Sequence, residues 1–470
     1  MNHNRIIRSI IDGGLIFIVV FAPLAFGAVH IWAYTMVVLL VFFILILCIV
    51  TNYLFAQERE AVVEKELLPV YSAFALFLVT VCFQIVPLPP NIIRLLSPQA
   101  HKIYSMAIPG YDKSIILRSL SIYPYATKIY LVKFISYMGI FFLITIEIRE
   151  IARIKRILIA LILVGFFEAL YGLYGYFSKN YSIFGFAKLF CSGPATGTFV
   201  NRNHFAGFLG MTVFVCIGYL LSKTSMRSRA SYGFMQFQQR IIDFLNTARA
   251  SESGLLLIII ITMIIGIVFS LSRMGVFSFV VALLIISFLT ILDRQKKLIA
   301  IIFLVFSLAL ATSLWYGIDP LVDRYYTAGT FFSGRAVVWE ATCELIKDFP
   351  LIGTGLGTYK TVFQRYKPED FDYRLLLYDH AHNDYLEMIS EVGIIGIIPL
   401  FWGNLSFLLL ILKKWAKTKN AFSKGISLGG VGALSYISLH SLMDFNLHIP
   451  ANAMIFFIIM ALTYCGATAG

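Results

Sequence analysis

The sequence predicts an all-α integral membrane protein with about 12 transmembrane helices. Of its 470 residues, 59% are hydrophobic and 15% are aromatic, and the mean hydropathy is +0.83. A soluble globular domain of this length is far less apolar. Runs of about 20 apolar residues, the length that a hydrocarbon core of about 30 Å requires of a helix, recur along the chain. These observations predict a single polytopic membrane domain over residues 1–470.

The predicted helices follow one another in chain order, and the fourth of them carries Lys128 and Lys133. The first apolar run is not followed by a small-residue cleavage site, so we expect it to remain in the protein and not to be removed as a signal peptide. The predicted segments are residues 13–33, 35–55, 67–87, 126–147, 155–177, 204–222, 254–271, 274–292, 298–316, 385–412, 427–443 and 450–467.

Lys and Arg gather in alternate connections, and this predicts the orientation because positive residues stay on the cytoplasmic side. With a cytoplasmic amino terminus, every strongly basic connection falls inside and both termini are cytoplasmic. The net charge of +13 is then mainly a topology signal, with attraction to anionic lipid as a secondary interpretation and little support for nucleic-acid binding. The loops predicted to face outward are residues 88–125, 178–203 and 317–384, together with the turn at 272–273.

The six cysteines show no CxxC spacing, which argues against a zinc or redox framework. Cys191 and Cys343 fall in outward loops and would be able to pair in an oxidising compartment. The sequence leaves a disulfide and two free thiols both open.

The large outward loop, residues 317–384, is predicted to be partly helical. Apolar positions within residues 336–347 approximate one helical face, and Pro350 disfavours helix in the residue before it. Gly353, Gly355 and Gly357 follow, and glycine permits unusual dihedrals and close backbone approach. Two interpretations stay open for them, a cradle for phosphate or sugar and a glycine-rich connector, because the spacing is not that of a P-loop.

Two arginines lie at predicted membrane boundaries. Arg273 occupies a short turn between apolar segments, where arginine costs up to roughly 2.5–3.5 kcal/mol and usually has a partner or a task. Arg202, flanked by Asn201 and Asn203, lies at the outward start of the segment 204–222. Two guanidinium groups on one face would hold a pyrophosphate, since each planar fork donates paired hydrogen bonds. The alternative for Arg273 is an interaction with lipid phosphate.

Arg335 is a third candidate for binding the substrate, and its alternative is an ordinary solvated charge in the loop. The outward segments show no paired-aspartate motif of the kind that holds Mg²⁺ beside phosphates. We therefore expect chemistry without a metal or other cofactor.

His382 supplies a proton acceptor, because an imidazole with an ordinary pKa of about 6.5 can take a proton from an attacking sugar hydroxyl. His380, Asn383 and Asp384 surround it and are candidates for binding the substrate. Two alternatives remain: a structural cap of the following helix, or a metal site formed by His380, His382 and Asp384.

Five motifs, in chain order, resemble the O-antigen ligase and O-antigen polymerase superfamily of bacterial membrane proteins. The resemblance runs from about residue 155 to the carboxyl terminus, and the order of the motifs makes it more specific than any single motif. The motifs are GTFVNRNH at 197–204, SRMG at 272–275, GTGLG at 353–357, HNDYLE at 382–387 with Glu391, Gly393 and Gly396, and SLMDFNLHIPAN at 441–452.

The resemblance implies a type C glycosyltransferase at the periplasmic face of the bacterial inner membrane. Such enzymes use glycan carried by undecaprenyl pyrophosphate, without nucleotide sugar or an obligatory metal. A ligase passes it to a sugar of lipid A-core, and a polymerase passes it to another lipid-linked repeat. On this chain the resemblance implies that His382 activates the acceptor, that Arg202 and Arg273 hold the departing pyrophosphate, and that the anomeric carbon is inverted. Because His380 is also present, the assignment of the base depends on the match of His382 and Asn383 to the family's pattern.

A lipid or polysaccharide transporter is the competing class, since it would also have many helices and buried charges. The polar groups here gather at outward helix ends and not at the bilayer midplane, which favours an enzyme. The His-Asn motif and the position of the large loop between the ninth and tenth helices favour a ligase over a polymerase. The sugar, the linkage, the oligomeric state and the roles of Asp444 and His448 stay open.

Overall fold

The computed structural model describes residues 2–54, 64–111, 116–188, 193–223, 248–293, 328–367 and 378–469. These residues are mostly helical, with a single short pair of strands among them, which confirms the predicted all-α membrane class. Ten helices within these ranges are long and apolar enough to cross a membrane. They are α1 (Asn2–Leu24), α2 (Ile31–Leu54), α3 (Leu68–Ile85), α6 (Pro124–Glu147), α7 (Ile151–Phe177), α8 (Arg202–Lys223), α10 (Ala248–Phe269), α11 (Arg273–Leu292), α16 (Asp384–Lys417) and α18 (Pro450–Thr468).

The predicted segment 427–443 corresponds to α17 (Ala421–His440), a helix of 20 residues that is not among those ten. The predicted segment 298–316 lies outside the described residues. The count of twelve therefore stays a prediction, while the other predicted segments all coincide with described helices.

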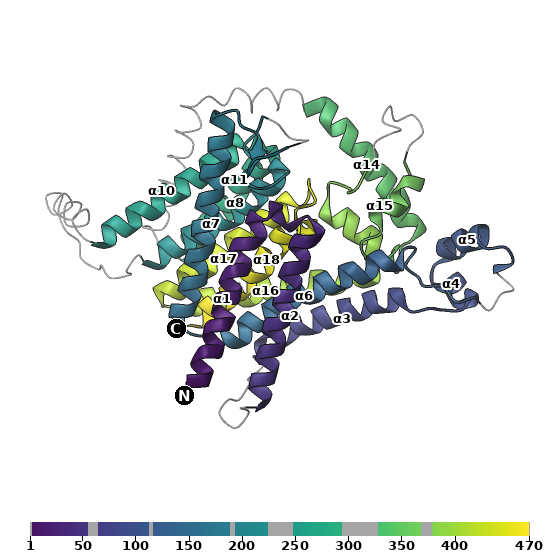
Figure 1. The fold of residues 1–470 in the computed structure, drawn as a ribbon, viewed down its shortest axis with the longest axis horizontal. Coiled ribbons are helices and arrows are strands. Elements are labelled where there is room, and N and C mark those ends of the chain that lie inside the picture. Colours follow the sequence, from purple (N-terminus) through teal and green to yellow (C-terminus); the bar gives the residue numbers. More distant parts are fainter. Residues whose placement is uncertain are drawn as a thin grey trace.

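Helices α8 and α18 form the centre of the bundle, because 94% and 89% of their most apolar stretches are buried. Figure 1 shows α7, α8, α17 and α18 packed together behind α1 and α2, with both termini on the same side. Glycines bring α8 and α17 into backbone contact: a Cβ added at Gly218 would lie 2.6 Å from the Gly425 carbonyl oxygen and from the Gly429 Cα. These glycines therefore serve the close packing of the two helices.

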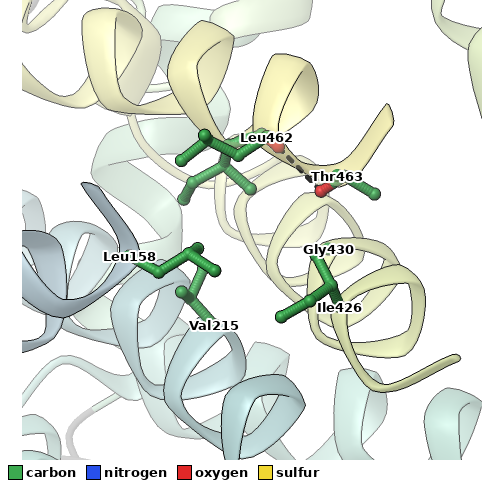
Figure 2. A pocket seen from close by; sticks show the side chains of 7 residues that line it. Leu158, Val215, Ile426, Gly430, Leu462 and Thr463 are labelled. Atoms are coloured by element: carbon green, nitrogen blue, oxygen red, sulfur yellow. Dashed lines mark hydrogen bonds between the residues drawn. The ribbon is translucent and has the colours of Figure 1, made fainter. Parts of the chain in front are cut away.

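One small apolar cavity, of about 10 Å³, lies among α7, α8, α17 and α18. Figure 2 shows it between Leu158, Val215, Gly430 and Leu462, with the Thr463 hydroxyl turned back onto its own helix. A space of this size holds at most about one water molecule, so it is a packing defect and not a substrate site.

The two ends of the bundle differ in chemistry. At one end Arg153 is buried and bound to Asp12 at 2.7 Å, Lys155 lies over the Phe422 ring, and Lys424 pairs with Asp293. These residues all belong to the end that the positive-inside pattern predicts to be cytoplasmic. At the opposite end of the antiparallel pair α11 and α17, the Ser272 hydroxyl lies 3.4 Å from His440 Nε2. The three basic connections that these residues represent, which are predicted to share a side, therefore lie at the same end.

A separate helical layer covers that opposite end. It contains α4 (Pro90–Leu96), α5 (Pro98–Ala107), α14 (Ala328–Asp348), α15 (Tyr359–Val362) and the 3-10 turn η4 (Phe363–Arg365), which Figure 1 shows on one flank of the bundle. Val338 and Leu345 of α14 are buried in its own apolar cluster, as the predicted helical face required. The helix α14 ends at Asp348, two residues before Pro350, which confirms the predicted stop.

The glycine-rich segment after α14 packs against protein. Gly353, Gly355 and Gly357 have φ of 74°, 110° and 77°. A Cβ at each would lie 2.3 Å from an atom of Glu391, Ser121 and Tyr130 respectively. The close approach that the glycines permit is thus to the chain itself, which favours a connector over a phosphate cradle.

Helix α16 is broken at Gly393, whose φ of 61° and ψ of −172° lie outside helical values. The amides of Ile394 and Ile395 donate to the carbonyls of Pro350 and Leu351 at 2.9 and 3.1 Å, so the break is stabilised by the segment after α14. Gln84, near the end of α3, donates to the carbonyls of Ile352 and Glu391 at 2.6 and 2.8 Å. The first two turns of α16 therefore belong to the same helical layer as α14.

Smaller elements complete the described chain. The short 3-10 turns are η1 (Phe26–Ala28), η2 (Lys65–Leu67) and η5 (Asn446–His448), and β1 (Ser182–Ile183) pairs antiparallel with β2 (Phe186–Ala187). Within the described part of the chain Cys343 carries a free thiol, whereas Cys191 lies outside the described residues.

Candidate functional site

A buried carboxylate, Asp444, lies in the connection between α17 and α18 and is 1% exposed. It accepts hydrogen bonds from the Asn203 side-chain amide and, at 2.9 Å, from the Phe445 backbone amide. His204 Nε2 lies 3.8 Å from Asp444 Oδ1. Residues from α8 and from the last connection thus meet at one charged centre.

His382 faces the same carboxylate, with its Nδ1 3.5 Å from Asp444 Oδ1. Its side chain is 33% exposed, so one edge of the ring is buried and the other is open. The backbone φ of His382 is 52°, a left-handed value that is uncommon for non-glycine residues and occurs where the surroundings hold it in place. This conformation presents the ring to Asp444 just before α16 begins.

Arg335 of α14 reaches the centre from the separate helical layer. Its guanidinium donates to the Met443 carbonyl and lies 3.7 Å from Asp444 Oδ2, and its side chain is 13% exposed. The interpretation of Arg335 as a solvated loop charge is therefore wrong. Burial lowers the pKa of Arg335, Asp444 opposes this, and the positive charge of Arg273 lowers it further. Arg273 and Arg335 are thus electrostatic neighbours.

Arg202 and Arg273 are the first residues of α8 and α11. Arg202 directly precedes Asn203, which binds Asp444, and Arg273 directly follows Ser272, which lies beside His440. Each arginine is therefore placed at a helix amino terminus, where unpaired backbone amides also favour negative charge. The structure brings these two positions to the end of the bundle that carries His382.

The charge of Asp444 is stabilised by its surroundings. Burial alone would raise the pKa of Asp444, but the imidazoles of His204 and His382 hold it well below its usual value of 3.8. A carboxylate held in its ionised form behind His382 can orient the ring, as in other acid–base pairs.

A second polar cluster lies beside the first. Glu387, 1% exposed, accepts from His380 Nδ1 at 2.7 Å and from the Ala381 backbone amide at 2.8 Å. His448 Nδ1 donates to Asp384 at 2.6 Å, and its Nε2 lies 3.3 Å from Glu387. Burial alone would lower the pKa of His448, but the charge of Glu387 and the bond to Asp384 raise it to about 10.

The predicted set of His380, His382 and Asp384 does not meet at one point. His380 faces Glu387 and stacks on Phe445 with ring centroids 4.0 Å apart, whereas His382 faces Asp444. Asp384 turns to His448 and to the Leu447 amide. The structure therefore contradicts the alternative in which His380, His382 and Asp384 bind one metal ion together.

The predicted asparagines bind backbone or the central carboxylate. Asn383 caps α16 by accepting from the amides of Tyr385 and Leu386 at 3.0 and 3.1 Å. Asn201 accepts from the Asn203 amide at 2.9 Å. These bonds shape the two segments that carry His382 and Arg202.

Asp444 and His448 are the functional candidates for which the sequence offered no role. The signal was present, because both lie in the motif SLMDFNLHIPAN and are titratable residues between two apolar helices. Their partners are 60 or more residues away in the sequence, so only the fold shows what they contact.

Comparisons with known proteins match part of this chain. Residues 258–401 match a family model described as O-Antigen ligase. A curated relative, "Exopolysaccharide production protein ExoQ" of Rhizobium meliloti (strain 1021), is 27% identical over 162 residues, which is 30% of this chain and 34% of that protein. The alignment thus spans about a third of that relative's length. The family match contains Arg273, Arg335 and His382, whereas Arg202 and Asp444 lie outside it.

Proposed function

We propose that this chain, a member of the O-antigen ligase and polymerase superfamily, is a glycosyltransferase that moves a glycan from undecaprenyl pyrophosphate to an acceptor sugar. The observation that carries the proposal is the pairing of the half-exposed His382 with the buried, ionised Asp444, beside the arginine-bearing starts of α8 and α11. This arrangement supplies a proton acceptor next to a place for a diphosphate.

In the proposed reaction, an acceptor hydroxyl attacks the anomeric carbon of the first sugar while the bond from that carbon to the pyrophosphate oxygen breaks. The hydroxyl proton passes to the open edge of His382, at Nε2, and Asp444 stabilises the imidazolium through Nδ1. Attack opposite to the leaving group inverts the anomeric carbon. The polyprenyl pyrophosphate is released, and the main task of the site is to stabilise its negative charge.

Arg202 and Arg273 are proposed to hold the pyrophosphate. Guanidinium forks and helix amino termini both bind phosphate oxygens, and here they coincide at the first residues of α8 and α11. Arg335 interacts electrostatically with both Asp444 and Arg273, and we assign it to the same anion. Asn201, Asn203, Asn383, Asp384 and His380 are proposed to position these groups through the bonds described above.

We expect the transfer step itself to proceed without a metal, because the three proposed guanidiniums would supply the positive charge that the leaving group requires. The site is proposed to face the periplasm, with the chain in the inner membrane and both termini in the cytoplasm. The separation of the Arg153 and Lys424 end from the His382 end supports this orientation.

The acceptor distinguishes two forms of this reaction. The family description favours a ligase that passes the glycan to lipid A-core. The similarity to an exopolysaccharide production protein favours a second candidate, a polymerase that passes it to another lipid-linked repeat. Donor, base and anion site are the same in both.

The test is a His382→Ala substitution in a strain that lacks the native gene. We expect loss of glycan transfer with normal protein level and intact export of the lipid-linked donor. Donor that accumulates as unattached polymer identifies a ligase, and single repeats on the final acceptor identify a polymerase. Transfer that continues in His382→Ala at the normal rate would contradict the proposal, and loss of donor export would indicate a transporter.

A further inference from the structure

The cluster beside the transfer site has the composition of a metal centre. His380, Glu387 and His448 each direct one ligand atom to a common point, and these atoms lie within 4.8 Å of one another. They come from the segment before α16, from its first turn and from η5. Two imidazoles and one carboxylate match the three protein ligands of many Zn²⁺ sites.

The spacing of the ligand atoms fits a tetrahedral ion. Bonds of about 2.0–2.2 Å place two neighbouring ligand atoms about 3.4 Å apart around Zn²⁺. Glu387 Oε1 lies 2.7 Å from His380 Nδ1 and 3.3 Å from His448 Nε2. The His448 pair already has this spacing, and the His380 pair would have to widen by about 0.7 Å to admit the ion.

His448 is prepared for such a role by its other nitrogen. Its Nδ1 lies 2.6 Å from an oxygen of Asp384, and because a carboxylate only accepts, Nδ1 carries the hydrogen. Metal-binding histidines commonly donate their second nitrogen to a carboxylate in this way. The side chain of His448 is 4% exposed, and within the described residues its Nε2 forms no hydrogen bond. A buried nitrogen thus points into the cluster without a hydrogen-bonding partner.

The remaining contacts hold the ligands in place. The second oxygen of Glu387 accepts from the Ala381 amide at 2.8 Å, and the ring of His380 stacks on Phe445. His380 is the more accessible imidazole, with a side chain 22% exposed. Access from the His380 side would leave the fourth position of the ion for water.

We propose that His380, Glu387 and His448 form a Zn²⁺ site that is separate from the transfer site and fixes the segment before α16 to η5. The ion would join residues on both sides of His382 and Asp444 and so hold that pair in place. It takes no part in the transfer chemistry, so the proposal does not depend on the proposed function.

The experiment uses the purified full-length protein in detergent, stripped with a chelator and dialysed. Co²⁺ is titrated as a spectroscopic substitute for Zn²⁺, followed by Zn²⁺ competition and by measurement of bound metal. We expect one equivalent of Co²⁺ with intense visible absorption bands, displaced by one equivalent of Zn²⁺. Asp384→Asn, which removes the support of His448, is expected to weaken binding by about 10- to 100-fold.

Ligand variants locate the ion. His380→Asn changes the most accessible ligand and is expected to abolish the visible bands while the protein still elutes as a folded species. His30→Asn, at an exposed histidine that is not one of the three ligands, is the matched control and should bind as the wild type does. If the wild-type protein binds no stoichiometric Co²⁺, the proposal is overturned whatever the variants do, because the contacts of His448 then require no metal ion. Binding that is unchanged in His380→Asn overturns it as well.

Discussion

Replacing Asp444 by Asn tests the pairing on which the proposed base depends. The amide keeps the shape of the side chain and can still accept from the Phe445 amide, but the charge behind His382 is lost. A neutral partner cannot stabilise an imidazolium, so the effect is expected on the transfer rate.

The size of the effect follows from the 3.5 Å separation of His382 Nδ1 and Asp444 Oδ1. At an effective dielectric constant of about 20, opposite unit charges at this distance attract by about 5 kcal/mol. Because the His382 side chain is 33% exposed, water screens part of this attraction. About 3 kcal/mol then remains in the transition state, which corresponds to a rate about 150-fold lower.

The assay measures single-turnover transfer from a purified lipid-linked donor to its acceptor, with donor binding measured separately. Asp293→Asn is the matched control, since Asp293 forms an ion pair with Lys424 at the other end of α11 and α17. We expect the control to transfer within about twofold of the wild type. An Asp444→Asn protein that binds donor and transfers at the wild-type rate would refute the reasoning.

Two further predictions concern stability. Gly393→Ala is expected to lower the melting temperature and to cost more than about 1–3 kcal/mol, since only glycine tolerates φ of 61° with ψ of −172° and a Cβ would lie 2.3 Å from the Leu351 oxygen. Gly13→Ala, in the interior of α1 with nothing within 4 Å, should instead stabilise by about 0.5–1 kcal/mol, and equal melting temperatures for the two variants would contradict this. The pKa of Asp444 is held below 3.8 in the folded protein. The ionised side chain therefore contributes to the free energy of unfolding above about pH 4, and this contribution is lost as the pH falls through the pKa of the folded state. The melting temperatures of wild type and Asp444→Asn should therefore differ at neutral pH and converge only in strong acid. A difference that disappears already near pH 6 would contradict this prediction.

The helices could be predicted because the membrane imposes a length and a composition on each of them. Apolar runs such as 126–147 and 450–467 coincide with α6 and α18 within two residues at each end. The helices α4 and α5 were missed, although Pro90 and Pro98 stand at their first positions, a usual site for proline. They are short and only partly apolar, so periodicity does not reveal them.

The candidate site was predictable in residue type and only partly in arrangement. Arg202, Arg273 and His382 are polar groups at apolar boundaries, which the sequence shows directly. Arg335 looked like a loop charge, because its burial depends on Met443 and Asp444, more than 100 residues away. The break at Gly393 was likewise hidden, since the apolar pattern continues through it and its amides are satisfied by residues 350 and 351.

The break in α16 also settles a problem of length. An unbroken helix of 34 residues would extend about 51 Å, well beyond an apolar slab of about 30 Å. The part after Gly393, Ile394–Lys417, measures about 36 Å, which a modest tilt accommodates. Gly393 thus lets one continuous stretch of chain form both a membrane-spanning helix and the short helical start that positions the segment with His380 and His382.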